Sequence, residues 1–154
     1  MFKLVIEHEA QDDLKKMIQA GGRKEVHARR ILAILSEIRN SQESLAELTT
    51  NNFETDDFDV KSFKEFWNDG VDLWRLKIFD FIEKKHQWST VPYRVFYAYD
   101  MSCLTFRILG IIHRDIAYDS EHEQTKRICR TYYDLGLPRH KVTHFRTSGR
   151  HRPH

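Results

Sequence analysis

The chain has 154 residues, 40% of them hydrophobic and 12% aromatic, which fits one globular domain and excludes a disordered chain. No run of 18 uncharged apolar residues exists, and the apolar stretch at the N-terminus is too short for a signal peptide, so we expect a cytoplasmic protein without a membrane span. The formal net charge is +2, but the positive charge is concentrated at the C-terminal end. Residues 139–154 hold five Lys or Arg and no acid. Without them the chain has 20 basic and 23 acidic residues, a net charge of −3.

A strand and two helices are predicted first. Residues 2–6 form a short apolar run typical of a strand, and a helical period begins at Glu9. Gly21-Gly22 ends the first helix, and the second is expected over Arg23–Arg39. Its buried side is predicted to hold Val26, Ile31, Leu32, Leu35 and Ile38. The two helices therefore form an αα-hairpin.

Residues 40–59 are a polar interlude in which Leu45 and Leu48 indicate a short helical turn. The interlude carries an acidic cluster, but it lacks the glycine and the final glutamate of a calcium-binding loop. We therefore expect a solvated loop rather than a metal site. The acidic cluster consists of Glu54, Asp56, Asp57 and Asp59.

Strand patterns dominate from residue 60. Alternation is visible over residues 60–66, 72–82, 92–100 and 102–115, with turns at Asn68-Asp69-Gly70 and over residues 83–91. The last three strands have short connections and are predicted to form an antiparallel meander. The period of two places Arg75 and Lys77 on one face of the sheet and Trp74 on the opposite, core-facing side.

A last helix is predicted over residues 120–135, with Ser120 and Glu123 as a capping box and with Gly136 and Pro138 ending it. The order β-α-α-β-β-β-α predicts an α+β fold, in which the αα-hairpin and the C-terminal helix pack on a small, mostly antiparallel four-stranded sheet. We expect one domain over residues 1–137 and a flexible basic tail over 138–154. The two cysteines, Cys103 and Cys129, fit neither a disulfide framework nor a zinc motif and are expected to be reduced and buried.

Cationic side chains recur on successive predicted strands. In an antiparallel meander these positions can converge on the sheet face that the helices leave uncovered, and like charges placed together are costly unless they bind an anion. Taken singly, each of them could equally be an ordinary solvated strand residue. The set comprises Arg75, Lys77, Arg94, His113 and Arg114, followed by Tyr118.

This set of residue types suits cleavage of RNA by its own 2′-hydroxyl. Cations stabilise the charge that develops on a pentacoordinate phosphate, and a Tyr or His can take the proton of the 2′-hydroxyl. An arginine can assist departure of the 5′-oxygen. Such a reaction requires no metal and no cofactor.

Several segments resemble the RelE/ParE family of toxins from bacterial type II toxin–antitoxin systems. They are LWRLKIFD, PYRVFYAYD, FRILGIIHRDIAYD and RICRTYYDLG, and the opening strand with EHEAQDDLKKM is also similar, so that the resemblance covers residues 2–135. In RelE-like members it implies a ribosome-dependent endoribonuclease that cuts mRNA and inhibits translation. The resemblance also implies a cognate protein antitoxin that covers or distorts the toxin's site.

The resemblance implies a role for each matching residue. Arg75 and Lys77 match basic residues that contact the RNA backbone and the scissile phosphate, and Arg94 matches an arginine that stabilises the transition state. Arg114 matches the arginine after the last strand, and Tyr118 matches a tyrosine proposed as general base. The spacing from Arg114 to Tyr118 is shorter than usual, so His113 is an alternative base.

Further residues are candidates for RNA contact. Trp88 lies in the predicted polar turn and could stack on a base or contact a protein partner, and Arg139 and Lys141 of the tail could bind RNA phosphates. Asp115 and Asp119 could orient His113 or Arg114, although Asp119 is more simply explained as a cap of the last helix.

Two other functions remain open from the sequence. A ParE-like inhibitor of DNA gyrase would keep the fold without nuclease activity, and a non-toxic relative would bind RNA through its basic tail. The sequence does not identify the antitoxin or a codon preference.

Overall fold

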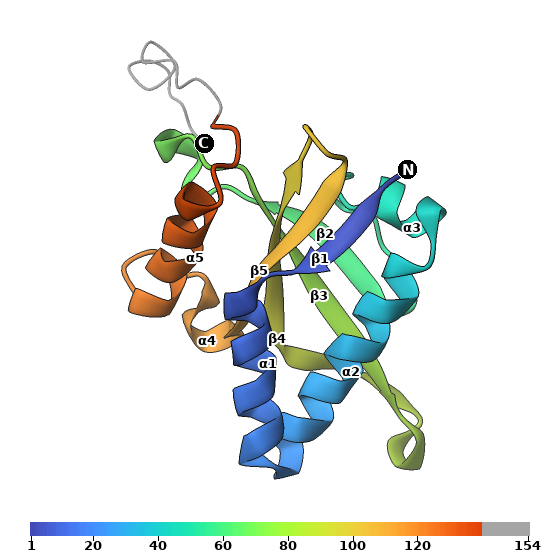
Figure 1. Cartoon of the computed structure of the whole chain (residues 1–154). Helices are drawn as coiled ribbons and strands as arrows, with labels where there is room; N and C mark the ends of the chain where they lie inside the picture. Colours follow the sequence, from blue (N-terminus) through green and yellow to red (C-terminus); the bar gives the residue numbers. More distant parts are fainter. Residues whose placement is uncertain (140–154) are drawn as a thin grey trace, which may run out of the picture.

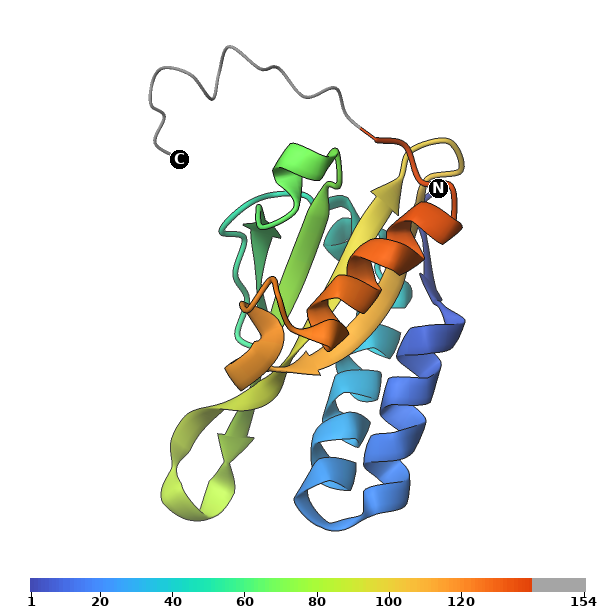
Figure 2. The same ribbon diagram turned by 90° about the vertical axis from the view of Figure 1, so that its left-hand side faces the viewer.

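Helices α1 and α2 pack on one face of a five-stranded sheet, and α5 packs on the other (Figures 1 and 2). The structure is a computed structural model that describes residues 1–139. In chain order its elements are β1 (Lys3–Ile6), α1 (His8–Ala20), α2 (Gly22–Arg39), α3 (Gln42–Ala46), β2 (Phe58–Phe63), the 3₁₀ turn η1 (Trp67–Asp69), β3 (Leu73–Ile82), the 3₁₀ turn η2 (Glu83–Lys85), β4 (Gln87–Asp100), β5 (Thr105–His113), α4 (Arg114–Ala117) and α5 (Glu123–Asp134).

The sheet has the strand order β1-β5-β4-β3-β2, with β1 parallel to β5 and the other pairs antiparallel. The α+β class and the antiparallel meander are confirmed, but the prediction of four strands is wrong. The fifth strand is β2, whose Phe58 pairs with Ile78 and whose Phe63 pairs with Leu73. Phe58 and Val60 belong to the core under α1 and α2, and Phe63 belongs to the core on the other face, so each face of β2 contributes to one of the two cores.

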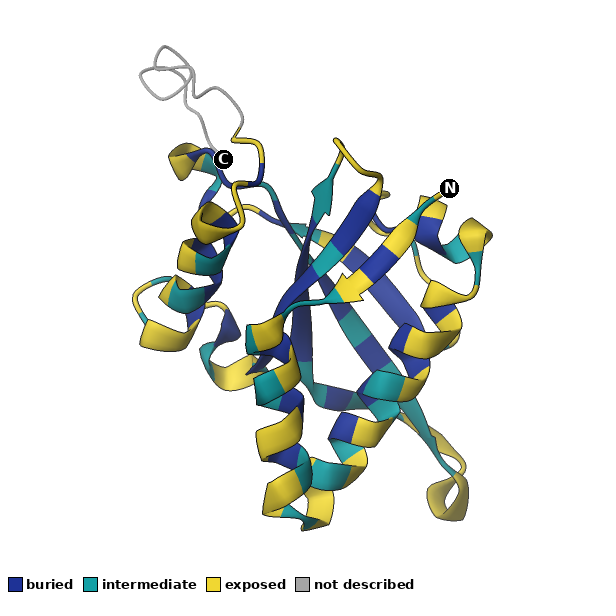
Figure 3. Ribbon diagram, in the orientation of Figure 1, coloured by how far each residue is buried: buried dark blue, intermediate teal, exposed yellow. Residues whose placement is uncertain are grey.

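Each face of the sheet carries its own core. Figure 3 shows many buried residues along the strands of the sheet. The α1–α2 face holds Leu76, Val95 and Tyr97, and Trp74 packs against it, as the alternation predicts. The α5 face is built around Phe63, Phe96, Leu109, Ile128 and Tyr132. Helix α5 approaches β5 closely at Gly110, where an added Cβ would lie 2.2 Å from Cδ1 of Ile128.

The αα-hairpin forms with the predicted turn, because Gly21 takes the left-handed φ of 69° that ends α1. The predicted buried side of α2 is rotated in part. Val26 is 60% exposed and Leu32 is only half-buried, whereas Ala28 and Ile34 are buried with Ile31, Leu35 and Ile38. Val26 lies on the side of α2 that points away from this buried set, because of the 3.6-residue helical repeat.

The segment predicted as a second turn is a two-stranded arm. Residues Phe79–Ile82 of β3 pair with Gln87–Thr90 of β4, and the arm projects beyond the rest of the sheet (Figures 1 and 2). The pairing slips by two residues between Lys77 and Phe79, next to Pro92. Proline donates no ladder hydrogen bond, so it fits this irregularity rather than the start of a strand.

The last helix begins later than predicted. The N-cap of α5 is His122, whose side chain accepts a hydrogen bond from the backbone N–H of Gln124 at 3.0 Å, so Ser120 and Glu123 do not form the capping box. Asp119 is not the cap either, because its carboxylate accepts from the N–H of Glu121 within the preceding loop.

The interlude over residues 40–59 contains the expected helical turn, α3, and its end is not a solvated loop. Asp59 lies inside β2 and is 8% exposed. Residues 52–55 cover the outer edge of β2 through backbone hydrogen bonds of 2.8 Å, among them Val60 N–H to the carbonyl of Phe53. Cys129 is buried as expected, but Cys103 is exposed because it lies in the turn between β4 and β5.

Candidate active site

Two arginines from neighbouring strands and one tyrosine meet on the α5 face. Arg75 of β3 and Arg94 of β4 both donate their Nε–H groups to Tyr118 Oη, at 3.1 and 3.3 Å. Tyr118 follows α4, and its ring packs on Phe63 at 5.9 Å between centroids. The arginines are each 7% exposed, whereas Tyr118 is 47% exposed. The two arginine side chains are therefore buried, and the phenol that both of them contact is accessible to solvent.

Arg75 has a buried counter-ion that the sequence pattern did not reveal. Its Nη1 lies 2.5 Å from Oδ1 of Asp59 on β2, and the two side chains are 8% and 12% exposed. Arg75 is thus neutralised inside the protein, and its guanidinium is held at both Nη1 and Nε. The sequence signal would have been the β2–β3 register, which brings Asp59 next to Arg75 across the strands.

Arg94 has no such counter-ion. Its Nη1 donates to the carbonyl of Val91 at 3.2 Å and its Nε to Tyr118, and no carboxylate of residues 1–139 lies within ion-pair distance. Every other arginine of this part of the chain that is not exposed has a carboxylate within 4.0 Å. These are Arg30 with Asp57, Arg75 with Asp59, Arg107 with Glu7 and Arg127 with Asp13.

Lys77 lies beside Arg94. The register places Asp59, Lys77 and Arg94 directly opposite one another on β2, β3 and β4, so the three side chains share the α5 face. Lys77 is half-buried and forms no hydrogen bond or ion pair with the described residues. With Arg75, Arg94 and Lys77 against Asp59, the formal charge of the site is +2.

Five N–H donors belong to each guanidinium, and Arg94 uses two of them within residues 1–139. A buried cation without a counter-ion is costly, and planar guanidinium groups suit carboxylate or phosphate oxygens. The chemistry of Arg94 and Lys77 therefore suits an oxyanion, and the hydroxyl of Tyr118 lies next to Arg94.

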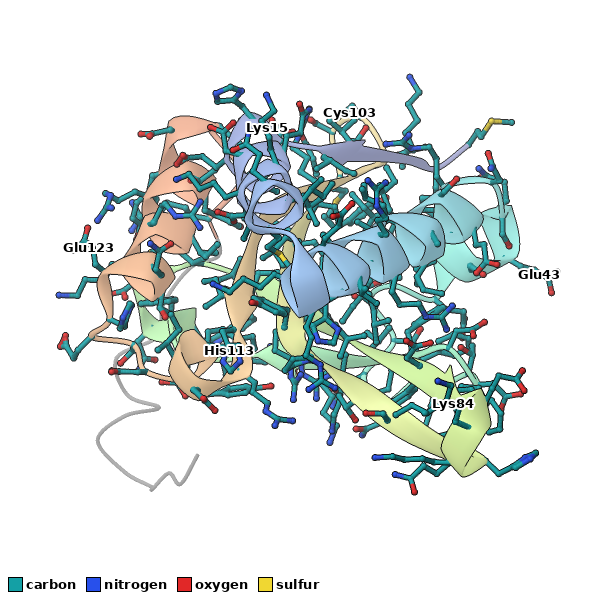
Figure 4. The ribbon with its side chains drawn as sticks, turned by 90° about the horizontal axis from the view of Figure 1, so that it is seen from below. Lys15, Glu43, Lys84, Cys103, His113 and Glu123 are labelled. Atoms are coloured by element: carbon teal, nitrogen blue, oxygen red, sulfur yellow. The ribbon has the colours of Figure 1, made fainter. Side chains whose placement is uncertain are left out.

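The structure does not bring His113 into this cluster. Its Nδ1 accepts a hydrogen bond from the N–H of Asp115 at 3.1 Å, which caps α4, and its ring packs edge-on against Tyr93. Tyr93 packs against the core on the α1–α2 side of the sheet. His113, labelled in Figure 4, also lines a cavity of about 440 Å³ to which α1, α4 and α5 contribute Asp13, Ile116 and Arg127. Arg114, the next residue, is exposed and makes no hydrogen bond or ion pair with the described residues.

Trp88 lies in β4 and not in a turn. It is 53% exposed, its ring packs on Phe81 across the arm at 5.3 Å, and η2 at the tip carries Lys84 and Lys85 (Figure 4). The arm therefore presents an aromatic surface near lysines, at a distance from α4 and His113.

Arg139 lies at the far end of α5, where its guanidinium donates to the carbonyl of Asp69 and stacks over Tyr133. Lys141 lies outside the described residues, as do residues 140–154. Within residues 1–139, no three His, Cys, Asp or Glu side chains form a group that could hold a metal ion. None of the helices in this same range has both the length and the apolar composition needed to cross a membrane.

Comparisons with known proteins give one structural likeness. No protein-family model matches the chain, and no curated protein matches it. A solved chain from the crystal structure of the archaeal RelE–RelB complex from Pyrococcus horikoshii OT3 aligns with a TM-score of 0.39 and 18% identity. The alignment covers 73% of this chain and 94% of the archaeal one.

Proposed function

We propose that the protein is the toxin of a type II toxin–antitoxin system and acts as a metal-independent endoribonuclease on mRNA. The observation that carries this proposal is the burial of Arg94 without a carboxylate, next to Lys77 and the accessible hydroxyl of Tyr118. A phosphodiester supplies the missing negative charge. The sequence resemblance to RelE-like toxins supports the choice of mRNA on the ribosome as substrate, in the cytoplasm, and of a cognate protein antitoxin as partner.

The proposed reaction is an internal transesterification. The O2′ of a ribose attacks the adjacent phosphorus and loses its proton, the bond between phosphorus and O5′ breaks, and O5′ gains a proton. The products are a 2′,3′-cyclic phosphate and a 5′-hydroxyl, so the atoms balance without a further reactant. Arg94 and Lys77 stabilise the charge on the pentacoordinate phosphate, Tyr118 takes the proton of O2′ and returns it to solvent, and O5′ gains its proton from water.

The placement of the other candidates refines their proposed roles. Arg114 is exposed beside α4 and is assigned to a flanking phosphate, whereas His113 caps α4 and is assigned no proton transfer. Trp88 on the arm is assigned to stacking with a base of the same RNA.

Translation in a reconstituted cell-free system tests the proposal, with primer extension on the mRNA and a DNA gyrase supercoiling assay run in parallel. We expect cuts in the mRNA that disappear in Arg94→Gln and persist in Arg29→Gln, a matched change of an exposed arginine on α2. Intact mRNA together with inhibited supercoiling would replace the nuclease by a gyrase inhibitor. Cutting at the wild-type rate by Arg94→Gln would contradict the assigned site.

A further inference from the structure

We infer that Asp59 is a positioning residue of this site, because it neutralises Arg75 and holds its guanidinium against Tyr118. Arg75 then orients the tyrosine and does not bind the phosphate, which Arg94 and Lys77 bind. The inference rests on the proposed nuclease function and states which cations bind the phosphate and which one positions the tyrosine.

The first step is the rigidity of the guanidinium. Because its nitrogens are coplanar, an ion pair at Nη1 also fixes the direction in which Nε–H points. Asp59 holds Nη1 at 2.5 Å, and Nε of the same group lies 3.1 Å from Tyr118 Oη. The three residues thus form a chain of contacts from the buried strand β2 to the accessible phenol. This arrangement limits the positions that Tyr118 Oη can adopt.

The second step is electrostatic. The carboxylate of Asp59 lies at the β2 end of the row that continues through Lys77 to Arg94. The charges of Asp59 and Arg75 offset each other, so this pair attracts a phosphate only weakly, whereas Arg94 has no internal counter-ion. The phosphate therefore binds to Arg94 and Lys77 rather than to Arg75.

The third step is a comparison of the two arginines. They come from adjacent strands, have the same exposure of 7% and donate to the same oxygen, yet only Arg75 has a carboxylate partner. Exchanging both Asp59 and Arg75 for neutral residues leaves the formal charge of the site at +2. Phosphate binding and tyrosine positioning can therefore be separated by one double substitution.

The experiment uses the charge-neutral double variant Asp59→Asn/Arg75→Gln of the full chain. Binding is measured with a single-stranded RNA in which a 2′-deoxy residue blocks cleavage, over a series of salt concentrations. Cleavage is measured under single-turnover conditions with ribosomes and an mRNA. The matched control is Glu25→Gln/Arg29→Gln, which removes an exposed ion pair of α2 without changing the net charge.

We expect the double variant to bind the RNA as the wild type does, with the same salt dependence, and to cleave about 10- to 100-fold more slowly. Reduced affinity with a slope of log K against log salt that is smaller by about 0.7 would show that Arg75 binds a phosphate and would overturn the inference. Unchanged cleavage would overturn it as well. A wild-type protein that neither binds nor cuts RNA would instead remove the proposed function itself.

Asp59→Asn alone serves if the double variant does not fold, as judged by circular dichroism and thermal unfolding. It removes one negative charge, and the amide oxygen that remains holds Arg75 less firmly than the carboxylate does. We expect tighter RNA binding at low salt together with slower cleavage. Unchanged or weaker binding would contradict the assignment of Asp59 as the group that offsets the charge of Arg75.

Discussion

Arg94 and Tyr118 are 24 residues apart in the sequence, and Nε of Arg94 lies 3.3 Å from Oη of Tyr118. Helix α4 follows β5 directly and makes this contact possible, because Ala117 packs into the core on the α5 face and Tyr118 is the next residue. A buried cation is thereby placed next to an accessible hydroxyl, which is the pairing that transfer of a proton near a phosphate requires.

Arg94→Gln should reduce the cleavage rate by about 10²–10³-fold, equal to about 2.7–4 kcal/mol of transition-state stabilisation, because a preorganised donor is lost. The measurement is the single-turnover rate on mRNA with ribosomes, compared with Arg29→Gln. Arg94→Lys keeps the charge but not the planar fork, and we expect it to restore only part of the rate. Full activity of Arg94→Lys would mean that charge is sufficient and geometry is not needed.

Tyr118→Phe should lower the cleavage rate by about 10²–10⁴-fold while leaving RNA affinity nearly unchanged, since the ring remains on Phe63 and only the hydroxyl is removed. Rates and dissociation constants measured on the same preparation separate the two effects. An equal loss in binding and in rate would indicate that the hydroxyl holds substrate and does not transfer a proton.

Lys77→Met should weaken binding of single-stranded RNA and reduce the slope of log K against log salt by about 0.7, because one phosphate contact is removed. Lys15→Met on the exposed side of α1 is the control and should leave the slope unchanged. Titrations at several salt concentrations provide the measurement. A slope unaffected by Lys77→Met would place this lysine outside the phosphate path.

Gly110→Ala should destabilise the fold by about 1–3 kcal/mol, because the new Cβ would overlap Cδ1 of Ile128. The free energy of unfolding is measured by urea denaturation. Ile128→Val removes that terminal methyl, so the double variant should lose less than the sum of the two single losses. Additive losses would show that the close approach of α5 to β5 is relieved elsewhere.

Ser102→Ala should make the protein less stable at neutral pH and should matter less in acid. The hydrogen bond from Ser102 Oγ to Asp100, at 2.6 Å, together with Arg107 holds the pKa of that carboxyl below its ordinary value. A depressed folded-state pKa stabilises the fold above the unfolded pKa of about 3.8 and loses this contribution as the pH falls through the folded value. Unfolding of both proteins between neutral pH and about pH 2 tests this, and a constant difference between them would contradict it.

Period-two alternation was sufficient to predict which strand residues share a face. It placed Trp74 toward the core and grouped Arg75 with Lys77, because in a strand the side of a residue depends only on its parity. Alternation carries no information on pairing between strands, so it does not predict the ion pair of Asp59 with Arg75. The polar composition of residues 40–59 predicts a solvated loop for Asp59 instead.

Two helix caps and one strand were also absent from the sequence prediction. His113 and His122 each cap a helix with an imidazole nitrogen, a role that a search for Ser, Thr, Asp and Asn overlooks. The polar composition of residues 83–91 suggested a turn, although Trp88 pairs with Phe81 across an extended arm whose strands have no core to cover. Only the half of the arm over Gln87–Thr90 was missed, because Trp88 is its single apolar residue and gives no alternation.

The parallel pairing of β1 with β5 determines when the sheet can form during synthesis of the chain. Lys3 of β1 is synthesised before its partner Thr105 of β5, which follows about a hundred residues later. Contacts of such long sequence separation slow folding. The strands β1 and β5 can pair only after β5 has left the ribosome, and Tyr118 follows β5, so the candidate site forms only after the residues of the whole sheet have been synthesised.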